Sequence, residues 1–107
     1  MIMYNKLVRD KVPEIIEGDG LVCHTKQLSE MEFLNEVNFT LYEELEQYTR
    51  VQTNEEAIEK LADVLELIHT LTKANGGTIE QLEQIRKQKY EKRGGFEQKT
   101  FLIHVTD

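Results

Sequence analysis

The stretch SEMEFLNEVNFTLYEELEQY, residues 29–48, is the part of the sequence that decides the fold. Ser29 followed by Glu32 forms a capping box, in which each side chain accepts a hydrogen bond from the other residue's backbone N–H at a helix start. Apolar side chains then recur every three or four residues, at Met31, Leu34, Val37, Leu41, Leu45 and Tyr48. This is the period of one helix face, so the stretch predicts a long helix with one buried side.

The next stretch, TNEEAIEKLADVLELIHTLTKANGG at residues 53–77, predicts a second long helix. Thr53 with Glu56 is its capping box, and two glycines end it. Its apolar face is wide and contains Ile58, Leu61, Val64, Leu65, Leu67, Ile68 and Leu71. Because this face covers well over half of the helix and one short chain has few elements to cover it, we expect a homo-oligomer, most simply a dimer.

A shorter helix is expected on each side of these two. Asp10 is expected to cap a helix that runs to about Glu17. Thr78 with Gln81 forms a third capping box, which predicts a helix to about Lys92. Together with the two long helices, these make about four helices in the chain.

Two strands complete the expected fold. Residues 21–28 and 100–105 alternate weakly in polarity and are expected to pair with each other. The predicted class is therefore mainly α: a helical bundle of about four helices with a small two-stranded β element, which assembles through helix packing. The length of 107 residues predicts a single domain over residues 1–107.

Composition excludes several classes of protein. The formal net charge is −7, from 13 Lys and Arg against 20 Asp and Glu, which argues against a nucleic acid polymer as partner. No apolar run is long enough to predict a membrane span and no leader peptide is recognisable, so we expect no membrane contact and a cytoplasmic protein. The single cysteine allows no internal disulfide and is expected to be a small buried side chain.

The charge is distributed unevenly along the chain. Residues 43–66 hold eight acidic and two basic side chains, whereas residues 86–99 hold six basic and two acidic ones. Acidic helices that hold a divalent cation beside basic segments that hold phosphate have this pattern, and so do complementary surfaces of an ordinary helical protein. The candidates for binding the phosphates of a nucleotide are Lys6, Arg9, Lys11, Lys89, Lys92 and Arg93. For those near a helix end, a favourable interaction with the helix dipole is the alternative.

Two acids fall on or beside the apolar faces of the long helices when residues are placed at about 100° intervals. They are Glu44 and Asp63, with Gln47 and Lys60 next to them. One interpretation is a Mg²⁺ site, because carboxylates from facing helices are hard oxygen ligands. The other is a buried ion pair that fixes the helix register, in which Lys60 pairs with Glu44 and Asp63.

Four segments, in this order, resemble one family over nearly the whole chain: YNKLVRDKVPEII at 4–16, LYEELEQY at 41–48, EKLADVLELIH at 59–69 and EKRGGF at 91–96. The chain resembles the MazG-like, phosphoribosyl-ATP-pyrophosphohydrolase-like branch of the all-α NTP pyrophosphatase superfamily. The resemblance implies a helical, oligomeric, Mg²⁺-dependent enzyme. Such an enzyme splits a nucleoside triphosphate or similar nucleotide between the α and β phosphates, releasing a monophosphate and pyrophosphate.

The family pattern is EExxE on one helix and ExxD on the next. Carried over by the resemblance, it falls on Glu43, Glu44, Gln47, Lys60 and Asp63. The resemblance thus implies Glu43, Glu44 and Asp63 as catalytic residues, and it implies Mg²⁺ ligands at Glu44, Asp63, Gln47 and Glu43. Gln47 lacks the charge of a carboxylate, and Lys60 puts a cation at a ligand position. We therefore expect weak hydrolysis, with a catalytically silent nucleotide-binding or structural dimerisation module as the alternative.

Overall fold

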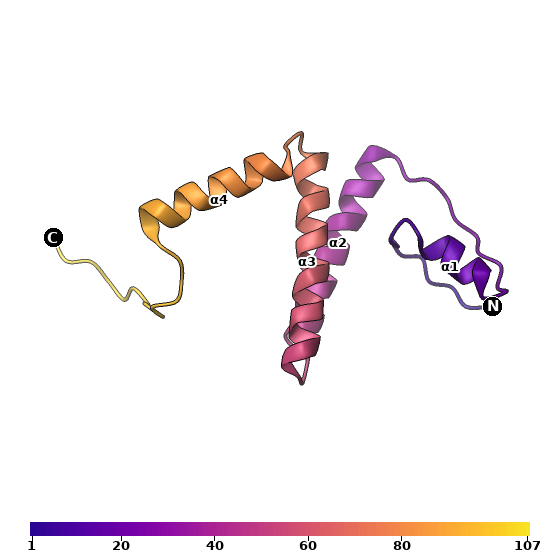
Figure 1. The fold of residues 1–107 in the computed structure, drawn as a ribbon, viewed down its shortest axis with the longest axis horizontal. Helices are drawn as coiled ribbons and strands as arrows, with labels where there is room; N and C mark the ends of the chain where they lie inside the picture. The colour runs from indigo at the N-terminus through magenta and orange to yellow at the C-terminus, as the bar shows by residue number, and fades with distance from the viewer.

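The computed structural model describes residues 1–107 and contains four helices joined by irregular segments. They are α1 (Val12–Gly18), α2 (Glu30–Tyr48), α3 (Asn54–Ala74) and α4 (Ile79–Arg93). Figure 1 shows α2 and α3 as an antiparallel pair, with α1 and the N-terminus on one side and α4 and the C-terminus on the other. The predicted mainly α class with four helices is confirmed. Helix contacts join only α2 to α3 and α3 to α4, so the α2–α3 pair is the centre of the molecule.

Side-chain caps begin α2 and α4 where the sequence predicts them. At α2, the N–H of Glu32 donates to Ser29 Oγ at 3.2 Å and the N–H of Ser29 donates to Glu32 Oε1 at 3.0 Å. At α4, the same reciprocal pair joins Thr78 and Gln81, at 3.1 and 2.8 Å. These bonds satisfy backbone donors that a helix start otherwise leaves free, and so they fix where each helix begins.

The other two caps differ from the prediction. At α3, the N–H of Glu56 donates to Thr53 Oγ1 at 3.1 Å, but the Glu56 carboxylate accepts from the N–H of Gln52 at 3.4 Å instead of from Thr53. Asp10 does not cap α1, because the N-cap is Lys11, whose side chain makes no capping hydrogen bond. A proline in the first turn of α1 has no N–H to satisfy and a φ suited to a helix, which compensates in part for the missing cap.

The predicted two-stranded β element is wrong, because the structure contains no strand. Residues 21–28 and 100–105 are irregular, and no backbone hydrogen bond joins them. Figure 1 shows that the first segment lies between α1 and α2, whereas the second lies beyond α4 at the opposite end of the molecule. A two-stranded β pair on its own is only marginally stable in water. These two segments would therefore need to pack against a third element before their pairing became favourable.

Very little of the chain is buried. Val37 on α2 and Val64 on α3 are the two buried residues, at 0% and 7% exposure. The radius of gyration is 18.5 Å and the accessible surface is 10234 Å², whereas a compact chain of this length has about 13 Å and about 6,200 Å². Apolar side chains predicted to face a core are exposed instead, among them Leu45, Ile58, Leu61 and Leu65. The α2–α3 pair therefore presents an apolar surface that its own chain does not cover.

Candidate functional site

Lys60 is the centre of a polar cluster at the interface of α2 and α3. Its ammonium donates to Gln47 Oε1 at 2.6 Å and to Glu44 Oε2 at 3.3 Å. Glu44 and Gln47 lie three residues apart on α2, which puts both side chains within reach of one group on α3. The side chains of Lys60 and Glu44 are 30% and 19% exposed, so the ion pair is largely shielded from water. The predicted Lys60–Glu44 pair is confirmed, and Gln47 is a second partner of the ammonium.

Asp63, close to Lys60 on α3, pairs with a cation from the start of the chain. Arg9 Nη2 donates to Asp63 Oδ1 at 2.7 Å, and the two side chains are 61% and 40% exposed. The predicted pairing of Lys60 with Asp63 is wrong, because the ammonium is directed to α2 and the guanidinium engages the carboxylate. Sequence reasoning missed this contact, since the two residues are 54 positions apart and only their opposite charges connect them. We refer to Arg9, Glu44, Gln47, Lys60 and Asp63 as the interface cluster.

Glu43 does not join the interface cluster. It lies on an exposed face of α2 beside a shallow hollow lined by Glu43, Glu46, Gln47 and Arg50. On this face the Arg50 guanidinium pairs with the Glu46 carboxylate one turn earlier, at 2.7 Å. No hydrogen bond or ion pair connects Glu43 to Glu44, Lys60 or Asp63, so its predicted catalytic and metal-binding roles gain no geometric support.

The predicted phosphate-binding residues are also scattered, apart from Arg9. Lys6 lies over the ring of Tyr4, 5.5 Å from its centroid, and Lys11 is the exposed N-cap of α1. The remaining three, Lys89, Lys92 and Arg93, lie exposed on α4. Figure 1 shows α4 projecting away from the α2–α3 pair. Within one chain, the basic end of α4 is therefore not brought to the interface cluster.

The donors of the interface cluster do not fit the predicted Mg²⁺ site. Mg²⁺ needs near-octahedral oxygen ligands at short distances, whereas the Glu44 and Gln47 oxygens hold an ammonium and the Asp63 carboxylate holds a guanidinium. Two carboxylates against two cationic side chains also leave the cluster without net charge to attract a dication. No three His, Cys, Asp or Glu residues anywhere in the chain form a group that could hold a metal ion.

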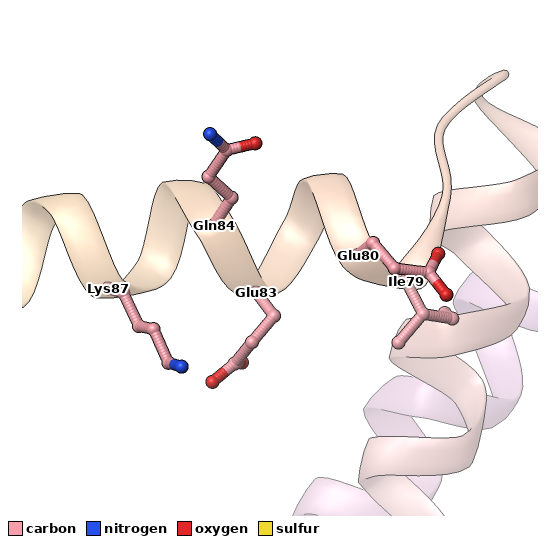
Figure 2. A pocket seen from close by; sticks show the side chains of 5 residues that line it. All are labelled: Ile79, Glu80, Glu83, Gln84 and Lys87. Carbon is pink, nitrogen blue, oxygen red and sulfur yellow. The ribbon is translucent and has the colours of Figure 1, made fainter.

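A hollow on the surface of α4 lies apart from all of these residues. It is lined by Ile79, Glu80, Glu83, Gln84 and Lys87. Figure 2 shows that these side chains diverge from a single helix, with Gln84 on the opposite side from Glu83 and Lys87, so they enclose no site. Beside it, hydrogen bonds of 2.6 and 2.9 Å from the Arg86 guanidinium lower the pKa of Glu83. This exposed pair stays within one helix and converges on no third group.

In comparisons with known proteins, no family model, no curated protein and no solved structure matches the chain. None of the four helices combines the length and the apolar character that a membrane span requires.

Proposed function

We propose that the chain binds a nucleoside triphosphate or similar nucleotide at the interface cluster and hydrolyses it slowly between the α and β phosphates. The resemblance of four sequence segments to MazG-like pyrophosphohydrolases supports this reaction class. Of the acids implied by that resemblance, Glu44 and Asp63 lie in the cluster. They are the carboxylates on which the proposal rests.

The observation that carries the proposal is the contact between Arg9 and Asp63. It ties the basic opening segment, which is expected to bind phosphate, to the acidic helix of the predicted site. Guanidinium and ammonium groups make charge-assisted hydrogen bonds to phosphate oxygens, and a carboxylate can accept a proton from water. The side chains of Arg9 and Lys60 are both partly open to solvent, so a ligand can reach them.

In the proposed reaction, a water oxygen forms a bond to the α phosphorus while the bond from that phosphorus to the α–β bridging oxygen breaks. Asp63, the more exposed of the two acids, accepts the proton from the water. Pyrophosphate leaves with the bridging oxygen, and Arg9 and Lys60 counter the negative charge on the phosphates. Slow turnover is expected, because an oxygen of the Asp63 carboxylate is already engaged by the Arg9 guanidinium at 2.7 Å.

Pyrophosphate release, measured across common and modified ribo- and deoxyribonucleoside triphosphates with Mg²⁺ in the buffer, tests this function. Asp63→Asn is expected to lower the rate by about 100-fold, the usual contribution of a general base. Glu46→Gln is a matched control, because it also removes a carboxylate that pairs with an arginine at 2.7 Å, but on the exposed face of α2. Equal rates for the two variants would contradict the proposed role of Asp63.

The second candidate function is nucleotide binding without hydrolysis. The Lys60–Glu44 pair favours it, because an acid held by an internal ammonium is less available for chemistry. The two functions differ in a thermal-shift experiment combined with the release assay, since any ligand that binds only the folded state raises its stability. Stabilisation by nucleotides without pyrophosphate release would indicate the silent nucleotide-binding form. If nucleotides cause neither stabilisation nor release, the remaining alternative is a structural dimerisation module.

We also propose that two copies assemble through the apolar surface of the α2–α3 pair. The chain exposes roughly 4,000 Å² more than a compact chain of its mass. This excess is larger than the roughly 1,000–2,500 Å² that each partner of an obligate homodimer buries, so a dimer interface would cover only part of it. A second copy is the simplest occupant, because a twofold contact lets one apolar surface cover its own equivalent.

A further inference from the structure

We infer that Lys60 is the resident cation of the interface cluster and takes over the part that a divalent metal has in the family the sequence resembles. The inference rests on the proposed function only for the class of ligand, a polyphosphate. Its basis is geometric: the Lys60 ammonium, carried by α3, lies 2.6 Å from the Gln47 oxygen and 3.3 Å from a Glu44 oxygen, both carried by α2. It joins the two helices through oxygens, as a bound metal ion would.

The replacement of a metal ion by the Lys60 ammonium is balanced in charge. Two positions that are acidic in the family pattern are here a neutral amide, Gln47, and a cation, Lys60. Glu44 and Asp63 remain as carboxylates, and Arg9 supplies a second cation, so the cluster is neutral without any ion from solution. A neutral cluster gives a free dication no electrostatic gain to offset the loss of its hydration. The chain therefore does not bind free Mg²⁺ at these residues.

Lys60 also keeps one donor free for a ligand. An ammonium carries three N–H donors, and the structure gives Lys60 two acceptors, on Glu44 and Gln47. The side chain is 30% exposed, so a ligand can reach it. A phosphate oxygen that accepted the third N–H would make a charge-assisted bond. Lys60 would then link a carboxylate of the protein to a phosphate of the ligand.

The first test measures metal binding without any substrate. Isothermal titration of MgCl₂ into the full-length wild-type protein is expected to give no binding heat. The double variant Gln47→Glu with Lys60→Glu restores the acidic positions and is expected to bind Mg²⁺, because four carboxylates then face one cation, Arg9. Mg²⁺ binding by the wild type as tight as that of the double variant would overturn the inference, whether or not the protein hydrolyses nucleotides.

The second test measures phosphate binding without metal. Tripolyphosphate, which has no base or sugar, is titrated into the protein in excess EDTA. Lys60→Met is expected to weaken binding about tenfold, a typical loss for one charge-assisted hydrogen bond, whereas Lys60→Arg keeps the cation and most of the affinity. Lys73→Met, at an exposed position in the last turn of α3, is the control and is expected to bind like the wild type.

The outcomes separate this inference from the proposed function. If Lys60→Met binds tripolyphosphate as tightly as the wild type, Lys60 does not contact phosphate and the inference fails. If no variant binds tripolyphosphate with or without Mg²⁺, the proposed function fails, and the MgCl₂ titration still decides whether Lys60 excludes the metal. Should Lys60→Met not fold, the double variant, which also lacks the Lys60 cation, gives the same decision in the tripolyphosphate titration.

Discussion

The α2–α3 pair is held by contacts between its two helices, whereas the segments outside it make few contacts with the rest of the chain. Within the pair, each helix starts at its own side-chain cap, Val37 and Val64 pack at the interface, and Lys60 bonds across it to two α2 side chains. Residues 1–28 reach the rest of the chain through one side-chain bond, from Arg9 to Asp63, and residues 94–107 through none.

This difference separates local from non-local information. A cap and a periodic apolar face lie within a few residues of each other, so a helix can form wherever they occur. A strand must find a partner, and neither terminal segment has one within this chain. We therefore expect the structure of the terminal segments and of the exposed face of the α2–α3 pair to depend on contacts outside the single chain.

The strongest test of this comparison is to charge the exposed apolar face of α3. We expect the wild type to be a dimer of the 12.5 kDa chain and Leu65→Glu, at a half-exposed position on this face, to abolish the dimer. Burying an unpaired carboxylate in an apolar interface costs far more than a surface substitution. Because the single chain buries only two residues, the monomeric variant is also expected to lose cooperative unfolding. Light scattering and chemical denaturation measure the two effects.

Gln52→Glu is the control for this experiment. It adds the same charge at an exposed turn between α2 and α3, outside the apolar face, and is expected to leave the dimer intact. A wild type that is monomeric at micromolar concentration would contradict the assembly proposal directly.

A smaller effect on stability is expected when a valine is shortened to alanine. Its size is expected to depend on whether the valine lies inside or outside the α2–α3 pair. Val37→Ala empties part of the best-buried position and is expected to destabilise the protein by about 2–3 kcal/mol. Val22→Ala makes the same change at a residue that is 82% exposed before α2, and is expected to have little effect. Urea denaturation compares them. A large loss for Val22→Ala would show that the segment before α2 is packed in the assembly.

The four helices could be predicted from the sequence because their signals are short-range. Ser29 with Glu32 and Thr78 with Gln81 each combine a cap with the reciprocal bond that confirms it. The two strands could not be predicted correctly. Weak alternation of polar and apolar residues indicates only which side chains would share one face of a strand, and it does not indicate whether a partner strand lies nearby.

The candidate site was predictable only in part, for the same reason. Glu44 and Lys60 meet because both lie on faces that helical periodicity turns toward the α2–α3 interface. The link from Arg9 to Asp63 depends on the path of a segment without regular structure, which no spacing rule describes. The basic residues on α4 lie far from the interface cluster because of the angle at which α4 leaves α3. The two glycines at residues 76 and 77 permit this angle but do not specify it.

The cross-helix ion pair gives the next prediction. Lys60→Met keeps the length of the stem but leaves the Glu44 carboxylate, 19% exposed, without its cation. The remaining exposure moderates the cost of this unpaired charge, so the expected loss is about 1–2 kcal/mol. Arg86→Met breaks the exposed Glu83–Arg86 pair within α4 and is expected to leave stability unchanged. Equal urea midpoints for the two variants would mean that the shielded pair adds no more than a surface pair.

The smallest effect is expected at the caps, where α2 and α4 differ in charge but not in geometry. The backbone N–H of Ser29, with its hydroxyl, lowers the pKa of Glu32, whereas the equivalent cap of α4 uses the neutral Gln81. Because the folded-state pKa lies below the ordinary glutamate value of about 4.3, the stabilisation by Glu32 is complete above that pH and is lost as the pH falls through the folded-state pKa. Glu32→Gln is therefore expected to flatten the acid side of the stability curve, and Gln81→Glu to steepen it. Urea midpoints between pH 7 and pH 3 measure both, and parallel curves for wild type and Glu32→Gln would show that the α2 cap does not depend on ionised Glu32.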